Sequence, residues 1–318
     1  MNSVAAIRFI ETLEHRHFQE FCEACQRDRY IGLCYGPPGV GKTVSALKYT
    51  RWEKVAAYQA ASRPRKLLAE VEACEVVFYT PPVVNTPKNI LRDIERLRFD
   101  LLDLRRERIR KNAERGLHRA QGRIQKIRER LIPGLRPVSV PRCDLSKEEG
   151  IAAAEAEKAF RRLQERMMTR QHAVTDPTKL IVIDEADRLK DSGLEQLRDM
   201  FDRSSIGLVL IGMPGIEKRL ARYPQLYSRV GFVHEFRSLA PKEVRRLLEE
   251  KRLPGALDAE ALTDEEVISA ILRVTGGNFR LLHRLLNQVA RVLEINRLKR
   301  VTREVVETAR ESLVIGTD

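Results

Sequence analysis

Short apolar runs alternate with amphipathic stretches at both ends of the chain, and the middle is amphipathic throughout. Each apolar run spans four to six residues, a length typical of strands buried on both faces of a parallel sheet. The predicted strands are residues 30–35, 76–80, 180–183, 207–211 and 232–236. The amphipathic stretches repeat their apolar positions with a helical period. The predicted helices are residues 4–27, 44–58, 64–73, 88–131, 147–172, 192–203, 216–223, 241–251, 264–274, 279–296 and 302–312.

The order of these elements predicts an α/β fold, with a parallel sheet covered by helices on both faces. Everything after the fifth strand is predicted to be helical. We therefore expect an α/β domain over residues 1–237 and a small all-helical domain over residues 238–318.

The middle of the chain, residues 88–172, interrupts this alternation. Its apolar positions step by four and three residues, as in a coiled coil, and prolines at 133, 137 and 141 divide it into two helices. We therefore predict an antiparallel helical hairpin inserted into the α/β domain. Between Arg96 and Arg136 there are fourteen Lys or Arg and five Asp or Glu residues. This excess suits an anionic partner, although a solvated charged face is the competing interpretation.

The segment between the first strand and the next helix carries the clearest motif. It reads Gly36-Pro37-Pro38-Gly39-Val40-Gly41-Lys42-Thr43, followed by Val44. A glycine-rich loop between strand and helix lets backbone N–H groups surround phosphate oxygens, and the helix N-terminus favours an anion. We expect Lys42 to reach the β- and γ-phosphates of ATP and the Thr43 hydroxyl to hold Mg²⁺.

A matching acidic pair ends the third predicted strand, Leu180 to Ile183. Asp184 would lie beside the phosphate loop and hold Mg²⁺ through water. Glu185 would orient or deprotonate the attacking water. The pair could instead cap the helical turn that follows it, a role compatible with metal binding.

Composition adds information on partners and compartment. The 318 residues carry a formal net charge of +13, which suits a polyanion but also simple solubility. The sequence shows no long apolar run and no secretory signal, and its five scattered cysteines fit reduced thiols, so we expect no membrane partner and a cytoplasmic location. Cys22 and Cys25 form a C-x-x-C near His15 and His17, but no second ligand pair follows at a zinc spacing, so buried thiols are favoured over a metal site.

Four stretches resemble the AAA+ ATPases, and more closely the DNA-transposition regulators of the MuB/TniB/TnsC type. They are GPPGVGKT at 36–43, LIVIDEADRL at 180–189, GLVLIGMPGIEKRLARYPQLYSRVGFVHEF at 207–236 and TGGNFRLLHRLL at 275–286. The resemblance implies a P-loop AAA+ core with a C-terminal helical lid, and it does not cover the hairpin.

The resemblance also implies roles for two arginines. Arg229 matches the arginine finger that reaches the γ-phosphate of a neighbouring subunit, and Arg280 matches the lid arginine called sensor 2. A guanidinium suits both, because its forked donors match phosphate oxygens. The family often has a polar residue at the end of strand 4, where this chain has Gly212 and Met213. That departure implies slow turnover of ATP.

The function that the resemblance implies is ATP-dependent assembly on double-stranded DNA, as a homo-oligomeric ring or helical filament. Such an assembly recruits or activates a transposase at target sites, with a target-selector protein as a further expected partner. Related initiator proteins touch DNA with an insertion in the interval where this hairpin lies. The residues expected to contact DNA phosphates are Arg105, Arg106, Arg108, Arg110 and Lys111.

Two other functions remain open from the sequence. One is a helicase-loader or clamp-loader-like ATPase, which would bind a helicase or a clamp. The other is a nucleotide-gated adaptor, whose hairpin binds a protein partner and which hydrolyses little ATP.

Overall fold

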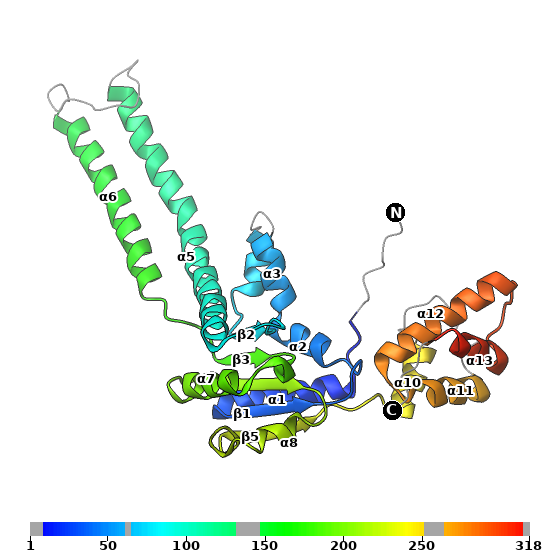
Figure 1. Ribbon diagram of the computed structural model, residues 1–318. Helices are drawn as coiled ribbons and strands as arrows, with labels where there is room; N and C mark the ends of the chain where they lie inside the picture. The colour runs from blue at the N-terminus through cyan, green and yellow to red at the C-terminus, as the bar shows by residue number, and fades with distance from the viewer. Residues whose placement is uncertain (1–8, 61–64, 132–146, 251–263, 314–318) are drawn as a thin grey trace. The chain divides into compact units, whose positions relative to one another are not determined.

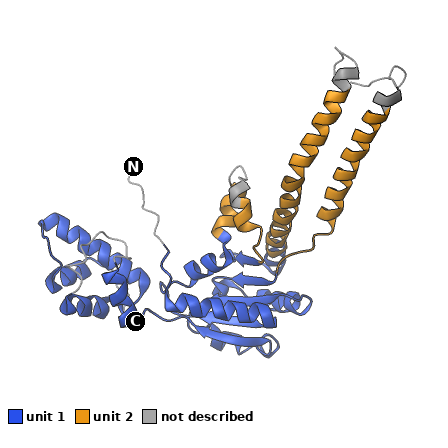
Figure 2. Ribbon diagram, turned by 180° about the vertical axis from the view of Figure 1, so that it is seen from behind, with its two compact units in different colours: residues 1–52, 76–92, 179–318 blue, residues 53–75, 93–178 orange. Residues whose placement is uncertain are grey.

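The computed structural model describes residues 9–60, 65–131, 147–250 and 264–313. Its contacts divide the chain into two units, which Figure 2 colours separately. Unit 1 comprises residues 1–52, 76–92 and 179–318, and unit 2 comprises residues 53–75 and 93–178. Every helix in the described ranges is too short or too polar to cross a lipid bilayer.

Unit 1 is built on a five-stranded sheet in the order β2-β3-β4-β1-β5, and every neighbouring pair is parallel (Figure 1). The predicted α/β fold with a parallel sheet is therefore confirmed. The strands are β1 (Ile31–Tyr35), β2 (Val76–Tyr79), β3 (Leu180–Ile183), β4 (Gly207–Gly212) and β5 (Val230–Glu235).

Strands β1, β2, β3 and β4 are buried along nearly their whole length, because helices cover both faces of the sheet. On one face, Phe18, Phe21 and Cys22 of α1 pack against Cys34, Val209 and Ile211. The helices of unit 1 outside its C-terminal part are α1 (Leu13–Asp28), α2 (Lys42–Thr50), the 3-10 turn η1 (Ala186–Arg188), α7 (Asp191–Asp202), α8 (Ile216–Leu220) and α9 (Pro224–Tyr227).

The C-terminal part of unit 1 has a hydrophobic cluster of its own, in which Leu247, Ile271, Leu285 and Val306 are fully buried or nearly so. Ile10, from before α1, joins this cluster. The helices here are α10 (Pro241–Glu249), α11 (Glu265–Thr275), α12 (Phe279–Asn296) and α13 (Arg303–Glu311). The division at residue 237 stays a prediction.

Unit 2 contains the hairpin and two short helices. Its elements are α3 (Trp52–Ala60), α4 (Arg65–Val71), α5 (Pro87–Leu131) and α6 (Lys147–His172), with α3 and α5 beginning in unit 1. The expected apolar stripe begins α5, where Ile90, Ile94, Leu101 and Leu104 are buried. The prolines expected to divide the hairpin lie outside the described residues.

Three of the differences from the sequence-based boundaries have a clear physical cause. The first helix begins at Leu13 rather than residue 4, because the Thr12 hydroxyl accepts from the His15 N–H and caps it. The helix expected over 44–58 is two helices, because Arg51 adopts a left-handed conformation that ends α2. The fifth strand begins at Val230, two residues early, where Ile31 N–H bonds to the Arg229 carbonyl.

Candidate functional site

The phosphate loop joins the end of β1 to the start of α2. Gly39 and Gly41 have φ angles of +84° and +113°, a left-handed conformation that side chains rarely adopt. The Lys42 ammonium donates to the carbonyls of Gly36 at 2.5 Å and Pro37 at 2.8 Å, folding over the loop. Lys42 is only 9% exposed, and burial lowers its pKa. Val44 lies on the exposed side of α2, whereas Val40 is buried beneath the loop.

Thr43 and Asp184 meet beside this loop, as the sequence predicted. The Thr43 hydroxyl donates to an Asp184 carboxylate oxygen at 2.7 Å. Asp184 is 3% exposed, and burial raises its pKa while the Thr43 hydrogen bond opposes that rise. Its position is fixed by its backbone N–H, which bonds to the Tyr79 carbonyl of the adjacent strand. A hydroxyl oxygen from the first turn of α2 and a buried carboxylate oxygen from the end of β3 thus converge next to Lys42.

This donor set fits Mg²⁺ bound to a nucleotide. Hydroxyl and carboxylate oxygens are hard ligands that suit Mg²⁺, which also retains waters and phosphate oxygens. When bound, the ion would neutralise charge on the phosphates. Thr43 and Asp184 are the residues that would hold it, while Lys42 and the loop N–H groups would hold the phosphates.

Glu185 follows Asp184 in a left-handed conformation, with φ +50°. A non-glycine residue there costs free energy, and such strain is often found at functional positions. The Glu185 carboxylate forms an ion pair with Arg188, whose guanidinium also donates to the Pro81 carbonyl at 3.0 Å. The side chain is 47% exposed, so it points to solvent at the carboxyl edge of the sheet.

The end of β4 has a polar group despite its Gly212-Met213 sequence. A carboxylate oxygen of Asp187 accepts the Met213 N–H at 2.8 Å. A Cβ at position 212 would lie 2.8 Å from that carboxylate and 2.5 Å from Ile216 Cδ1, so a larger residue there would displace one of these side chains. Burial lowers the pKa of Lys42, and the negative charge of Asp187 partly opposes this shift. The sequence analysis missed Asp187, which the segment Asp184-Glu185-Ala186-Asp187 already contained.

The start of α12 contacts the back of the phosphate loop. The Asn278 side-chain amide donates to the Pro38 carbonyl at 2.8 Å, while its oxygen caps α12. The Arg280 N–H donates to the Gly39 carbonyl at 3.0 Å. These contacts bring Arg280 to the loop, where its charge opposes the protonation of Lys42. The contact made by Asn278 was not predicted, because capping residues are common and this one carries no phosphate-binding signature.

Arg229 lies at the opposite edge of the sheet from the phosphate loop. It directly precedes β5, which runs parallel to β1 with Ile31 paired to Val230, whereas the loop follows the far end of β1. Five residues of strand separate the two edges, a span of about 16 Å. Arg229 therefore cannot complete the nucleotide site of its own chain.

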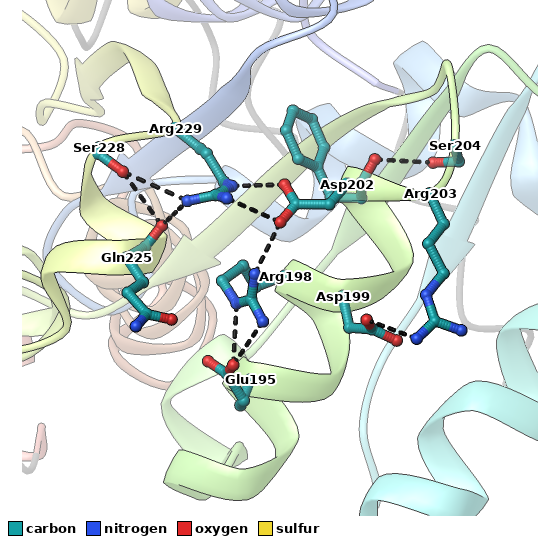
Figure 3. Close-up of polar contacts among 10 residues, drawn as sticks. Glu195, Arg198, Asp199, Asp202, Arg203, Ser204, Gln225, Ser228 and Arg229 are labelled. Atoms are coloured by element: carbon teal, nitrogen blue, oxygen red, sulfur yellow. Dashed lines mark hydrogen bonds and ion pairs between the residues drawn. The ribbon is translucent and has the colours of Figure 1, made fainter.

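The Arg229 guanidinium is held by an acidic residue that the sequence analysis did not single out. It forms a two-pronged ion pair with Asp202, the last residue of α7, and donates to the Gln225 carbonyl (Figure 3). Asp202 also pairs with Arg198 at 2.7 Å, and Arg198 pairs with Glu195 at 2.6 Å. The Arg229 hydrogen bond is the main reason why the pKa of Asp202 is lowered.

The five basic residues expected to contact DNA all lie on α5 within unit 2. Four of them face carboxylates: Arg105 pairs with Glu75, Arg108 with Glu72, and both Arg110 and Lys111 with Glu107. We call Arg105, Arg108, Arg110 and Lys111 the base cluster. Arg106 is partly buried, and its Nε has no hydrogen-bond partner among the described residues.

Cys22 and Cys25 are buried in α1 against the sheet. Burial raises the pKa of Cys25 to about 12 and that of Cys22 well above its ordinary value. Both are therefore protonated thiols at neutral pH. The described residues contain no cluster of three His, Cys, Asp or Glu side chains arranged to hold a metal ion.

Comparison with known sequences identifies a family. Residues 25–220 match the model of the AAA domain, AAA_22. A potential ATP-binding protein of Staphylococcus aureus is 38% identical over 315 residues, which is 97% of each chain.

Similar solved structures include RuvB of Thermotoga maritima, a Holliday junction branch migration motor. Its TM-score is 0.47, with 16% identity over 95% of this chain and 70% of RuvB. ORC1 of Aeropyrum pernix, solved in complex with DNA, has a TM-score of 0.48, with 19% identity over 97% of this chain and 67% of ORC1.

Proposed function

This chain belongs to the AAA domain family, and from that premise we propose that it is an ATP-dependent, DNA-binding regulator of transposition. The observation that carries the nucleotide part is the hydrogen bond between the Thr43 hydroxyl and the buried Asp184 carboxylate, next to an enclosed Lys42. These groups would bind Mg²⁺ and ATP from the loop side. The transposition part is supported by the sequence motifs, and the DNA part by the basic hairpin.

In the proposed reaction, water attacks the γ-phosphate of ATP and ADP leaves. Glu185 accepts a proton from that water, which first requires the carboxylate to leave its ion pair with Arg188. Asp187 supplies the polar group at the end of β4 and helps orient the same water. Arg280 contacts the phosphates from the lid side. Hydrolysis is slow in an isolated chain for two reasons. Glu185 must first leave Arg188, and Arg229 lies too far from the phosphate loop of its own chain to help.

We propose that Arg229 acts in trans within a homo-oligomer, either a ring or a helical filament. Its place at the opposite edge of the sheet supports this, since only another copy can bring it to a γ-phosphate. To do so, Arg229 leaves its ion pair with Asp202 and contacts the γ-phosphate bound to the neighbouring subunit. An arginine finger typically accelerates phosphoryl transfer by 10³–10⁵-fold.

A nucleotide-gated protein adaptor is the second candidate. The base cluster favours it, because those charges are already compensated by Glu72, Glu75 and Glu107. An adaptor would bind a partner protein through the hairpin and leave duplex DNA unbound.

The proposed function is tested first by whether a gene adjacent to this one encodes a transposase, and then by strand transfer in vitro with that enzyme. We expect transfer to a target duplex to require this protein and ATP, and to fail with the Lys42→Ala variant. Transfer that proceeds equally without this protein would contradict the regulatory role, while duplex binding measured alongside would show whether the DNA part survives.

A further inference from the structure

The hairpin carries two kinds of basic side chain, and only one kind is available to an external partner. The base cluster is compensated: its members lie within 2.8–3.4 Å of Glu72, Glu75 or Glu107. Lys111 also lies over the Tyr58 ring, at 5.5 Å from its centroid. Binding a phosphate with these groups would first break contacts within unit 2.

Farther along α5, a second set of basic residues is exposed. They are spaced by four, four and three residues, so they share one face of the helix. None of them forms an ion pair with any residue that the structure describes. We call this set the α5 row: Arg115, Arg119, Arg123 and Lys126.

The facing helix α6 repeats the arrangement. Its exposed basic residues recur at strict four-residue intervals, again along one face and again with no ion pair to a described residue. We call this set the α6 row: Lys158, Arg162, Arg166 and Arg170. A hollow of about 800 Å³ opens among three of these arginines together with Glu165 and Thr169. Three guanidinium groups and a single carboxylate make this hollow positively charged.

The spacing of the rows suits a linear polyanion. A helix rises 1.5 Å per residue, so the α6 row spans about 18 Å, with about 6 Å between successive charges. Over that length a DNA duplex carries about ten phosphates. An acidic protein surface seldom repeats its charge so regularly, whereas every duplex does. Phosphate contact needs no base-reading side chain, so such a surface would bind duplexes of any sequence.

We propose that the α5 row and the α6 row form a phosphate-binding surface for duplex DNA of any sequence, and that the base cluster holds unit 2 together. This proposal rests on the DNA-binding part of the proposed function and gives it a location. In this proposal the residues that contact DNA lie later on α5, and on α6, whereas the sequence alone indicated residues 105–111.

The test compares three variants of the full chain, each losing three positive charges from the hairpin. The first is Arg162→Gln/Arg166→Gln/Arg170→Gln in the α6 row. The second is Arg115→Gln/Arg119→Gln/Arg123→Gln in the α5 row. The matched control is Arg105→Gln/Arg108→Gln/Arg110→Gln in the base cluster. Affinity for a mixed-sequence duplex is measured over a range of salt concentrations. ATP affinity verifies that unit 1 is intact, and far-UV circular dichroism verifies that each variant keeps the helical content of the wild type, so only variants that do are compared.

Each phosphate contact adds about 0.9 to the slope of log affinity against log salt, so losing three contacts lowers affinity by roughly two to three orders of magnitude near 0.1 M salt. We expect that loss, with a shallower slope, in both row variants and less than a tenfold loss in the control. Replacing the three α6-row arginines by lysine should restore most of the affinity, because phosphates accept either cation.

Equal losses in all three variants would show that affinity follows net charge alone and would overturn the proposed location. Unchanged duplex affinity in both row variants would also overturn it and would favour a protein-binding arm. In both cases the wild-type chain still binds DNA, so the proposed function stands. A wild-type chain that binds no duplex would instead contradict the DNA-binding part of that function.

Discussion

The phosphate loop and the hairpin both present positive charge to an expected polyanion, but they do so in opposite ways. At the loop, one lysine is nearly enclosed, hydrogen-bonded to two carbonyls and placed beside the Thr43 hydroxyl and the buried Asp184 carboxylate. Along the hairpin rows, eight cations are exposed and have no ion pair with a described residue. A small ligand with fixed geometry is recognised by few groups held in place, whereas a long polyanion is recognised by many groups that are free to adjust.

The largest effect is expected at the phosphate loop. Lys42→Ala removes the charge that neutralises the β- and γ-phosphates, so ATP affinity should fall at least a hundredfold. Lys42→Arg is a useful control, because it keeps the charge but not the fit within the loop. Calorimetric titration with ATP and Mg²⁺ measures both. If Lys42→Ala binds ATP as the wild type does, the loop is not the nucleotide site.

Arg229 tests whether a partly exposed charge, held by Asp202 in the isolated chain, can complete the nucleotide site of another chain. In assembled protein, Arg229→Ala should lower the rate of hydrolysis about a thousandfold while leaving ATP affinity of the isolated chain unchanged. Mixing it with Lys42→Ala protein should restore part of the rate, since one chain offers the loop and the other the arginine. Mixed assemblies that form but stay inactive would argue against a shared site. Asp202→Asn is the companion variant, because it frees the guanidinium without removing it.

Glu185→Gln separates binding from chemistry within the loop site. The amide keeps the shape but cannot accept a proton, so single-turnover hydrolysis should slow about a hundredfold while ATP affinity is retained. Rapid-quench measurements with bound ATP give the rate. Arg188→Gln frees Glu185 from its ion pair and should not slow hydrolysis. An unaffected rate in Glu185→Gln would mean that another residue accepts the proton of the attacking water.

Asp187 has a smaller expected role. Asp187→Ala removes the acceptor of the Met213 N–H and the negative charge near Lys42, and we expect about a tenfold loss of the hydrolysis rate. Asp187→Asn keeps an acceptor for Met213 and should lose less. A steady-state ATPase assay compares the two. Equal rates in all three proteins would leave the end of β4 without a role in hydrolysis.

The smallest expected effect is structural and concerns the compensated part of the hairpin. Glu107 is 3% exposed and pairs with Arg110 and Lys111. Glu107→Gln should therefore lower the local stability of α5 by about 1–2 kcal/mol. Hydrogen exchange along residues 101–111 measures this change, with ATP affinity as the unchanged reference. If protection is the same as in the wild type, the base cluster does not stabilise unit 2.

The candidate residues of the loop site could be singled out from the sequence for a local physical reason. A phosphate loop needs its glycines, lysine and threonine within eight consecutive residues, and a buried apolar run directly before Asp184 indicates where that carboxylate ends up. The parallel sheet follows from the same kind of run, because a strand buried on both faces must be apolar throughout. These features depend on neighbours along the chain, so they can be read from it.

Contacts between distant segments could not be read in the same way. Asp202 holds Arg229 across 27 positions, and Glu72 and Glu75 compensate arginines more than 29 positions away. The sequence shows how many charges of each sign are present, but it does not show which of them pair. The sequence therefore shows that the hairpin carries an excess of positive charge. Only the fold shows that the base cluster is paired with carboxylates and that the two rows, among the described residues, are not. The first helix was extended too far because an apolar period continues through Ile10, which packs with α10–α13 instead.

The central claim is that nucleotide bound at the enclosed site controls duplex binding by this protein. It is tested most directly by the equilibrium affinity of the wild-type chain for a mixed-sequence duplex, measured with Mg²⁺ and ATP and again without nucleotide, at one salt concentration. We predict at least tenfold tighter binding with ATP in the wild type and no such difference in Lys42→Ala. Equal affinity with and without ATP, or no duplex binding in either condition, would contradict the claim.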